Sequence, residues 1–422
     1  MLEQEALLHQ MELQVLHGIQ ERKHMAGQGR GESQSAPIVR MVDRLISFGI
    51  ELRASDIHID PQEDRLRLRY RVDGALWESE EPFSLRIHPV LVSRLKIMAG
   101  MDISEHRRPM DGHIDYSGEG GKVDLRVASV PVKYGESLVI RLLNAERRLR
   151  NMEELGLLEE TGKRLRQLVH HPSGMFIACG PMNSGKTTSL YAILLELNSP
   201  DIHIMTIEDP VEGVIDGINQ IEVNTRAGLG FAEGLRAILR MDANAIMVGE
   251  IRDELTAQIA VRAALTGHML ITTLHARDSI TALFRLLEMG IPPYLLAATL
   301  SGVLSQRLVR KICPFCREPY AVQTGSAEAA LLGEPVLSRQ TLWRGRGCEK
   351  CHGTGFLGRM PLHELLLMDV ELRQAILHRE DMETIETLAR GKGFHGMWED
   401  GVEKARQGMT TLGEVRRVLY AH

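Results

Sequence analysis

The sequence predicts an α/β protein made of more than one folded unit. Its 422 residues exceed the ~100–200 residues of a typical domain, so two or three cores are expected. From about residue 151 to residue 308, segments of helical and strand type alternate, which is typical of a parallel sheet with crossover helices. Before this region, alternating apolar and polar residues interrupted by turns predict a smaller α+β unit.

The first segment of the chain is expected to form a helix followed by a flexible linker. Apolar side chains recur every four residues among polar neighbours, at Leu7, Met11, Val15 and Ile19. This spacing is typical of an amphipathic helix that packs on its own protein. Residues 26–35 are small, polar and rich in glycine, so the first folded unit should begin near Pro37.

The remaining elements follow in order along the chain. In the α+β unit we expect a strand at Arg65–Val72, a helix at Val90–Met98, and a strand pair at Val123–Val130 and Ser137–Leu143. A helix at Glu154–His171 then leads into the apolar strand Met175–Cys179. We divide the chain into an N-terminal helix and linker (1–36), an α+β domain (37–150), the domain with the parallel sheet (151–308), a cysteine-bearing insert (309–364) and a helical C-terminal subdomain (365–422).

The composition argues against several classes of function. Lysine and arginine number 50 and the acids 56, so the net charge of -6 gives no chain-wide attraction to nucleic acid or anionic lipid. Only 4% of the residues are aromatic, which leaves few side chains to stack on single-stranded nucleic acid. Any basic surface must therefore be local.

The same sequence gives expectations about the cellular compartment. No stretch reaches the ~18–20 uninterrupted apolar residues of a membrane-spanning helix, and the acidic start does not resemble a secretory signal. Four of the five cysteines form two CxxC pairs, which favours metal binding in a reducing compartment over a disulfide framework. We therefore expect a cytoplasmic protein.

A phosphate-binding loop is the most specific motif in the chain. The pattern G-x-x-x-x-G-K-[ST] is satisfied by Gly180-Pro181-Met182-Asn183-Ser184-Gly185-Lys186-Thr187. The loop lies between an apolar strand and a helix expected from Thr188 to Asn198, where backbone amides and the helix N-terminus can surround phosphate oxygens. Lys186 would reach the β- and γ-phosphates, and the Thr187 hydroxyl would hold Mg²⁺. Cys179, just before the loop, is expected to be an inert buried residue.

Phosphoryl transfer also requires carboxylates. Two apolar segments of strand type each end in acids: Glu208 and Asp209 follow the first, and Glu250 follows the second. Because ligands gather at the carboxyl ends of parallel strands, these acids should converge on the phosphates. The alternative is that such residues cap the next helix, and it stays open above all for Glu212 and Asp253.

A third strand carries a histidine at each end. The apolar run between His268 and His275 follows the Glu250 segment through a single helix, so it is expected to lie close by. Either histidine would be suited to contact the γ-phosphate or the acids. A structural role within the strand is the alternative for both.

The four paired cysteines predict a structural metal site. Two CxxC pairs, Cys313 with Cys316 and Cys348 with Cys351, are separated by a long loop. Paired thiolates on tight turns fit a tetrahedral Zn²⁺ site, and four sulfur ligands leave no open position for catalysis. Unpaired thiols or a redox pair are the alternatives.

These motifs together resemble those of a known family. The phosphate loop and the later acidic and histidine segments resemble, in order and spacing, the Walker A, Asp box, Walker B and His box of the secretion ATPase superfamily, at 180–187, 208–212, 249–253 and 266–275. The likeness is greatest to the type II secretion and type IV pilus assembly ATPases, the GspE/PilB group. It extends into the first unit at 54–61, 69–74 and 94–103, and spans about residues 37–420.

The resemblance implies a fold, cofactors and partners. A PAS-like α+β domain would precede a RecA-like P-loop domain with a four-cysteine zinc-binding insert. ATP would sit between the two domains with Mg²⁺, and six subunits would form a ring. The implied partner is the inner-membrane platform protein of a secretion or pilus system, which would place the ring at the cytoplasmic side of that membrane.

Individual roles follow from the same resemblance. Glu208 is implied to polarise the attacking water, Glu250 to act as the Walker B acid near Mg²⁺, and His275 to contact the γ-phosphate. Arg126 and Arg141 match the family's arginine fingers. Solvated strand arginines in ion pairs are the alternative for these two.

The sequence departs from the family pattern at three places. Met182-Asn183 replaces the usual Thr-Gly, and residues 241–244 read Met-Asp-Ala-Asn where Gln-Asp-Pro-Asp is common. Neither change removes the lysine, the hydroxyl or the acids. The roughly 36 residues before the first domain are too few for the folded extension that many secretion ATPases use to bind a membrane recruiter, which puts docking by that route in doubt.

The predicted function is a hexameric Mg²⁺-dependent ATPase that powers assembly of a type IV pilus or a type II secretion pseudopilus. The zinc insert favours assembly, since the family's retraction ATPases typically lack it. A retraction or DNA-uptake ATPase of the same superfamily is one alternative, and a RecA-like nucleic-acid motor is another. The feature that would favour the nucleic-acid motor is a basic cluster near the cysteines, formed by Arg307, Arg310, Lys311, Arg317, Arg344 and Arg346. This cluster is local, and the chain as a whole is not basic. We therefore expect no nucleic-acid partner.

Overall fold

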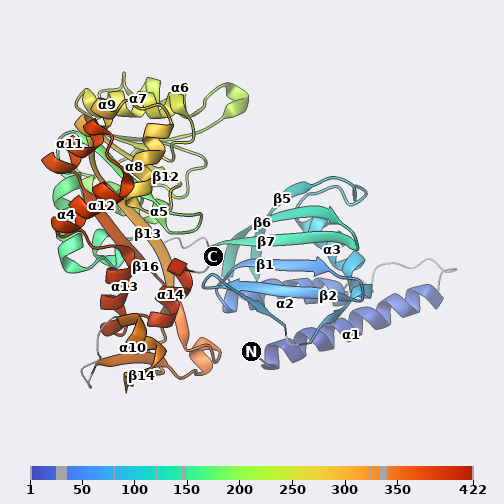
Figure 1. Ribbon diagram of the computed structural model, residues 1–422. Coiled ribbons are helices and arrows are strands. Elements are labelled where there is room, and N and C mark those ends of the chain that lie inside the picture. Colours follow the sequence, from blue (N-terminus) through green and yellow to red (C-terminus); the bar gives the residue numbers. More distant parts are fainter. Residues whose placement is uncertain are drawn as a thin grey trace. The chain divides into compact units, whose positions relative to one another are not determined.

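The computed structural model describes residues 2–24, 36–79, 81–118, 121–144, 149–323, 325–332 and 340–420. By internal contacts the chain divides into two units, Met1–Arg147 and Arg148–His422 (Figure 1). Each unit has its own sheet and its own hydrophobic core.

Unit 1 is an antiparallel sheet with helices packed on it. Its helices are α1 (Leu2–His24), α2 (Ala36–Glu51) and α3 (His88–Met98), and its strands are β1 (Ala54–Pro61), β2 (Arg65–Val72), β3 (Ala75–Glu78), β4 (Phe83–Ser84), β5 (Met110–Gly118), β6 (Gly121–Val132) and β7 (Gly135–Asn144). The strand order is β3-β2-β1-β7-β6-β5, with β4 beside β2. The expected strands and the helix near residue 90 are confirmed: β2 has the expected ends, and α3, β6 and β7 extend beyond the expected ends by one or two residues.

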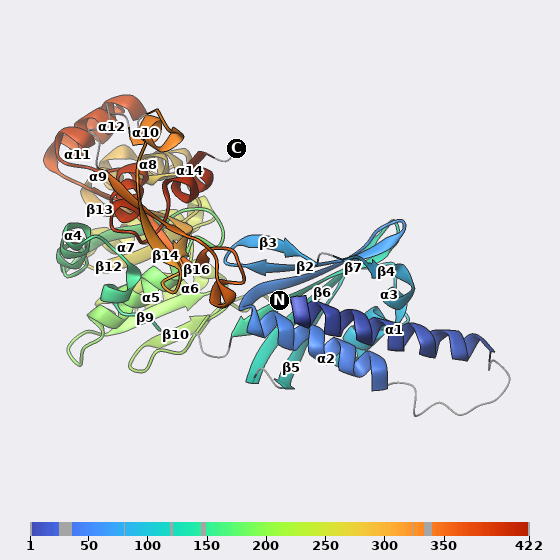
Figure 2. The same cartoon turned by 90° about the horizontal axis from the view of Figure 1, so that it is seen from below.

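Alternation along the strands explains the core of unit 1. In β2 the side chains of Leu66, Leu68 and Tyr70 are buried, while the arginines between them are more exposed. Leu8 and Val15 of α1 are buried in the same core, which agrees with the amphipathic helix expected there. Figure 2 shows α1 and α2 lying side by side. The unit therefore has the α+β composition that the sequence predicted.

Unit 2 contains the RecA-like sheet and its covering helices. Its strands are β8 (Gly174–Cys179), β9 (Ile204–Glu208), β10 (Asn219–Glu222), β11 (Ala245–Val248), β12 (Met269–Leu274), β13 (Leu300–Ile312), β14 (Arg317–Ala321), β15 (Thr341–Gly345) and β16 (Phe356–Leu367). The main sheet has the order β10-β9-β11-β12-β8-β13-β16. All of its pairs are parallel except β13 with β16, so the expected parallel sheet with crossover helices is confirmed.

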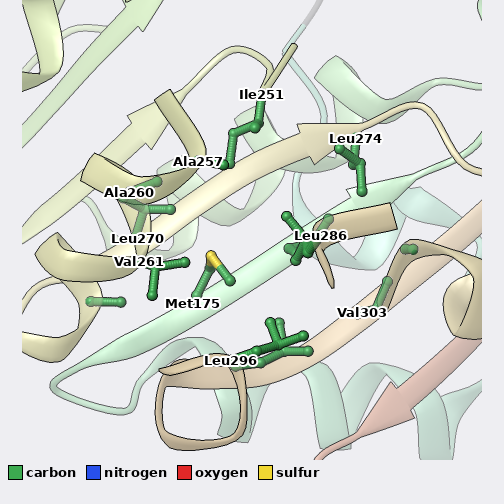
Figure 3. Close-up of a cluster of buried hydrophobic side chains, with 14 of the residues drawn as sticks. Met175, Ile251, Ala257, Ala260, Val261, Leu270, Leu274, Leu286, Leu296 and Val303 are labelled. Carbon is green, nitrogen blue, oxygen red and sulfur yellow. The ribbon is translucent and has the colours of Figure 1, made fainter. Parts of the chain in front are cut away.

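Helices cover both faces of this sheet. The helices of unit 2, which include those that cover the sheet, are α4 (Glu159–Val169), α5 (Lys186–Leu197), α6 (Phe231–Ile238), α7 (Glu254–Leu265), α8 (Ser279–Glu288), α9 (Pro293–Thr299), α10 (Ala327–Leu332), α11 (Val370–His378), α12 (Met382–Gly391), α13 (Met397–Arg406) and α14 (Leu412–Tyr420). Figure 3 shows the core on the α7 face, where Met175 of β8 and Leu270 of β12 lie near Ala260 and Val261 of α7. The opposite face packs against α4 and α5. Because both faces are covered, β8 and β12 are buried at every position.

The register of the parallel strands fixes one edge of the sheet. Ile207 pairs with Val248, Val248 with Thr272, and Thr272 with Ile177, so these residues form one row. The residues that follow this row on each strand therefore lie at the same edge of the sheet. This carboxyl edge therefore collects the segments after β8, β9, β11 and β12.

Two parts of unit 2 differ in detail from the sequence prediction. The helix expected from Glu154 begins only at Glu159, because Met152–Leu155 forms a short 3₁₀ turn that ends at Gly156 in the left-handed region, with φ 68°. At the other end, β13 continues to Ile312 and β16 begins at Phe356, so both strands run from the main sheet into the cysteine-bearing segment.

None of the helices in the described ranges combines the length and apolar composition needed to cross a bilayer.

Candidate functional site

The phosphate loop leaves β8 at the carboxyl edge and enters α5. Gly180 has φ 147° and Gly185 has φ 89°, backbone conformations that favour glycine. A Cβ atom on Gly180 would lie 2.5 Å from the backbone oxygen of Gln306 and 2.6 Å from Ser184 Oγ. The loop is therefore folded tightly on itself and on β13, with no room for a side chain at Gly180.

The local departure from the family pattern has a structural basis. Asn183 has φ 60°, in the left-handed region where glycine, the residue usual at this place, is unstrained. Asparagine is among the residues that tolerate this conformation best. The neighbouring Met182 is 79% exposed, so neither side chain fills the loop's interior.

The polar groups of the loop fit a bound polyphosphate. Ser184 is 2% exposed, and its Oγ has no hydrogen-bond partner among the described residues. Lys186 Nζ donates to the carbonyl oxygens of Gly180 and Pro181, each at 2.9 Å. Burial lowers the pKa of Lys186. Within the described ranges, loop carbonyls are the hydrogen-bond partners of this buried ammonium group, and an anionic ligand would stabilise it.

The hydroxyls expected to serve phosphate and metal begin the next helix. Thr187 and Thr188 lie in the first turn of α5 and are both exposed. Free amides at a helix N-terminus attract anions, and the exposed hydroxyls stand beside them.

One loop contact was not foreseen from the sequence. Gln306 of β13 is 1% exposed; its Nε2 donates to Ser184 O at 2.7 Å, and its Oε1 accepts from Ser189 Oγ at 2.9 Å. This side chain joins the loop, α5 and β13. No motif could have identified it, because Gln306 lies far along the chain from the loop and meets it only through the pairing of β13 with β8.

Glu208 is the last residue of β9 and is almost fully buried, with 2% of its surface exposed. Its carboxylate accepts hydrogen bonds from Tyr191, Thr206 and Gln220. The next residue, Asp209, is exposed, and its Oδ2 lies 3.8 Å from Nη1 of Arg252. The carboxyl edge therefore presents Asp209 to solvent and holds Glu208 inside.

Glu250 and His275 meet at the same edge. Glu250 forms an ion pair with Arg252, and its Oε2 lies 3.8 Å from His275 Nε2. Burial, followed by the positive charge of Lys186, lowers the pKa of His275, which keeps its ring neutral at pH 7. The structure therefore places Glu250, His275 and Lys186 close enough for their charges to affect one another.

His268 lies elsewhere. It precedes the first residue of β12, whereas His275 follows the last, so the whole strand separates them. The Nδ1 of His268 hydrogen-bonds with the carbonyl oxygen of Ala263 at 3.0 Å. In this conformation His268 stands at the amino end of β12 and is not brought together with the phosphate loop.

The two candidate arginine fingers are neighbours in unit 1. Arg126 of β6 is paired in register with Arg141 of β7, and both side chains are exposed. Nε of Arg141 donates to Asp56 Oδ1 at 3.0 Å. The ion-pair alternative therefore describes Arg141 in this conformation, and Arg126 remains exposed on the same sheet.

The four paired cysteines converge into one cluster. Their sulfur atoms all lie within 4.8 Å of one another, with Sγ–Sγ distances of 3.8 Å for Cys313–Cys348, 3.8 Å for Cys316–Cys351 and 3.7 Å for Cys348–Cys351. A tetrahedron with Zn–S bonds of ~2.3 Å has edges of ~3.8 Å. The sulfur positions therefore fit Zn²⁺.

Hydrogen bonds to its sulfur favour the thiolate form of Cys351, whereas burial raises the pKa of Cys313 and Cys316. Burial by itself raises the pKa of a thiol, but hydrogen bonds donated by the backbone amides of Cys348 and Gly355 bring the pKa of Cys351 to about 7. The fifth cysteine behaves differently. Cys179 is fully buried in β8, as expected, and burial raises its pKa to about 12, which disfavours the reactive thiolate.

Comparisons with known proteins agree with the fold and with these motifs. A family model described as Type II/IV secretion system protein matches residues 31–417. The type II secretion system protein E of Pseudomonas aeruginosa is 44% identical over 387 residues, which are 92% of this chain and 76% of that protein. The type IV pilus assembly ATPase PilB of Thermus thermophilus is 45% identical over 379 residues, which are 89% of this chain and 42% of that protein.

One similar solved structure contains a bound nucleotide. The crystal structure of the pilus retraction motor PilT with bound ADP superposes with a TM-score of 0.56 at 25% identity, covering 88% of this chain and 95% of that chain. A family match across almost the whole sequence, and identities above 40% over most of it, leave the assignment unambiguous. The chain belongs to the type II/IV secretion system protein family, whose members include secretion and pilus assembly ATPases.

Proposed function

We propose that this chain is a Mg²⁺-dependent ATPase that powers assembly of a type IV pilus or a type II secretion pseudopilus. The observation that carries the proposal is the phosphate loop at the carboxyl edge of the sheet, with a buried lysine that lacks an anionic partner and a serine hydroxyl without a hydrogen-bond partner among the described residues. Relatives of this chain are named as secretion and pilus assembly ATPases.

Each residue at the edge has a task in this chemistry. The loop amides and Lys186 would bind the β- and γ-phosphates, and Thr187, with Glu250 close to the phosphates, would hold the Mg²⁺ ion. The bound ion would neutralise part of the phosphate charge. We assign polarisation of the attacking water to Glu208 and a γ-phosphate contact to the neutral ring of His275. Asp209, at the same edge, would help to bind the nucleotide, and so would His268 if the ring assembly brings it near.

Completion of the site is assigned to a second subunit. Arg126 and Arg141 would reach the nucleotide as arginine fingers in a ring of six subunits. An arginine finger supplied in trans raises turnover ~10³–10⁵-fold. Isolated subunits should therefore hydrolyse ATP slowly.

The four-cysteine segment favours the assembly direction within the family. We propose that it binds Zn²⁺ as a structural ion and contributes to docking on the inner-membrane platform protein. The ring would then be peripheral to the cytoplasmic side of that membrane. Pilus retraction and DNA uptake are the alternative outputs of the same motor.

Turnover at increasing protein concentration tests the proposal. Specific ATPase activity should rise through the range in which sizing experiments show rings forming, and Glu208→Gln should retain ATP binding while losing turnover. Glu233→Gln, an exposed acid on α6, is the matched control and should change neither. Specific activity that stays flat while rings form would contradict completion of the site in trans, and absence of ATP binding would sink the proposal.

A further inference from the structure

The carboxylate of Glu208 is enclosed by neutral hydrogen-bond donors. Tyr191 Oη donates to Oε2 at 2.5 Å, while Thr206 Oγ1 and Gln220 Nε2 donate to Oε1 at 2.6 Å and 3.0 Å. Thr206 and Tyr191 are 0% and 4% exposed. Among the described residues no lysine or arginine forms an ion pair with Glu208, in contrast to Glu250.

Counting acceptor sites shows what this arrangement leaves open. An ionised carboxylate has about four lone-pair sites, two on each oxygen. Oε1 already accepts two hydrogen bonds and Oε2 accepts one. The remaining site therefore lies on Oε2, the oxygen that Tyr191 holds.

Each donor is itself fixed in place. Gln220 Nε2 also donates to Gly213 O at 3.0 Å, and its Oε1 accepts from the amide of Ile215 at 2.8 Å, so its side-chain amide has one orientation. The oxygen of Tyr191 accepts from the amide of Glu212 at 3.1 Å, which leaves its hydrogen directed at Glu208. Burial, followed by the hydrogen bond with Glu208, raises the pKa of Tyr191, so it remains a donor.

Tyr191 also connects Glu208 to the phosphate loop. Thr187 and Tyr191 both belong to α5 and are four residues apart, so they lie on the same side of the helix, one turn from each other. The helix that begins with the phosphate-binding residues therefore carries the hydroxyl that orients Glu208. Thr206 precedes Glu208 by two positions on β9 and so faces the same side of the sheet.

From this geometry we propose that Tyr191 and Thr206 are positioning residues for hydrolysis, which hold the Glu208 carboxylate so that Oε2 keeps one acceptor site for the attacking water. This rests on the proposed ATPase function. Tyr191 sets the oxygen relative to α5, and Thr206 with Gln220 occupies the other oxygen. Removal of either hydroxyl frees the carboxylate to rotate without altering the loop that binds the phosphates.

The test separates turnover from nucleotide binding in the full-length chain. Tyr191→Phe should lower kcat about ten- to a hundredfold, the range expected for one hydrogen bond to a charged group. The KM for ATP and the affinity for a fluorescent ATP analogue should stay within about threefold of wild type. Thr206→Val should behave alike, and Thr206→Ser, which keeps the hydroxyl, should restore most of the turnover. Tyr294→Phe alters an exposed tyrosine of α9 and should change nothing.

The possible results are distinguishable. An active wild type together with unchanged kcat in Tyr191→Phe overturns the inference alone. A parallel loss of kcat, nucleotide affinity and thermal stability in Tyr191→Phe, or failure of Thr206→Ser to recover turnover, assigns these residues a structural role and also overturns it. A wild type that assembles but does not hydrolyse ATP refutes the proposed function, and the inference with it.

Discussion

Replacing Lys186 by methionine should stabilise the nucleotide-free protein while abolishing nucleotide binding. Lys186 is 9% exposed, and in this conformation the carbonyl oxygens of Gly180 and Pro181 accept from its ammonium group. Burial lowers its pKa from 10.5, so the charged form opposes folding. That cost is present below the lowered pKa and disappears as the pH rises to the unfolded value. Methionine has similar length and carries no charge to bury.

The expected gain is that of other stabilising single substitutions. These commonly add ~0.5–2 kcal/mol to the free energy of unfolding. For a domain of this size, each kcal/mol raises the melting temperature by roughly 2–4 °C. Nucleotide binding should reverse the order of the two melting temperatures, because ATP at a hundred times its dissociation constant stabilises the wild type by ~2.7 kcal/mol. The variant should gain nothing from the nucleotide.

Thermal unfolding with and without a non-hydrolysable ATP analogue and Mg²⁺ measures both effects. Lys163→Met is the matched control, because Lys163 is an exposed lysine of α4 whose surface ion pair with Glu159 contributes little. We expect Lys186→Met to melt above wild type without nucleotide and below it at saturating nucleotide. A variant that melts below wild type without nucleotide would refute the reasoning from burial.

Four further predictions concern other parts of the chain. Serine at both Cys313 and Cys316 should abolish bound zinc in elemental analysis, whereas the Cys179→Ser control should keep it; equal metal content would refute the ligand assignment. Glu414 forms ion pairs with Arg310 and Arg417, and although burial opposes ionisation, these partners hold its pKa at about 2. Glu414→Gln should therefore cost ~1.5–3 kcal/mol of unfolding free energy at pH 7, the range for hydrogen bonds to a charged group. This difference should shrink between pH 4.5 and pH 2, so a constant difference in urea titrations contradicts the assignment. Asn183→Ala should destabilise the phosphate loop by ~1–2 kcal/mol and Asn183→Gly should not, because φ is 60° there. Arg126→Ala should lower turnover in assembled rings by ~10³-fold or more and leave ATP binding intact; rings that keep wild-type turnover would exclude Arg126 as a finger.

The features that the sequence predicted best are those encoded by adjacent residues. The phosphate loop, the acids after two strands and the cysteine pairs each consist of residues close together in the chain. Their placement then needs only the rule that parallel strands end at one edge. The four cysteines could be grouped because each CxxC pair already forms half of a tetrahedral site.

The features that were missed depend on tertiary contacts. Gln306 reaches the phosphate loop only because β13 pairs with β8, and Gln220 reaches Glu208 only because β10 lies beside β9. Tyr191 and Thr206 were within reach of sequence reasoning, since helical and strand periodicity place them beside Thr187 and Glu208. The late start of α4 was not, because the helical pattern of residues 154–158 gives way to a turn at Gly156.

The long pairing of β13 with β16 connects two separate parts of unit 2. The ladder runs from Gly302 paired with Leu367 to Ile312 paired with Phe356, so it contains Gln306 beside the phosphate loop and ends next to Cys313. Seven residues of extended strand cover about 20 Å. The register shift between Arg310 and Ile312 lies between these two ends, and an irregularity of this kind bends and twists the strand that contains it. The phosphate loop and the cysteine cluster are therefore joined by one strand that changes direction just before Cys313.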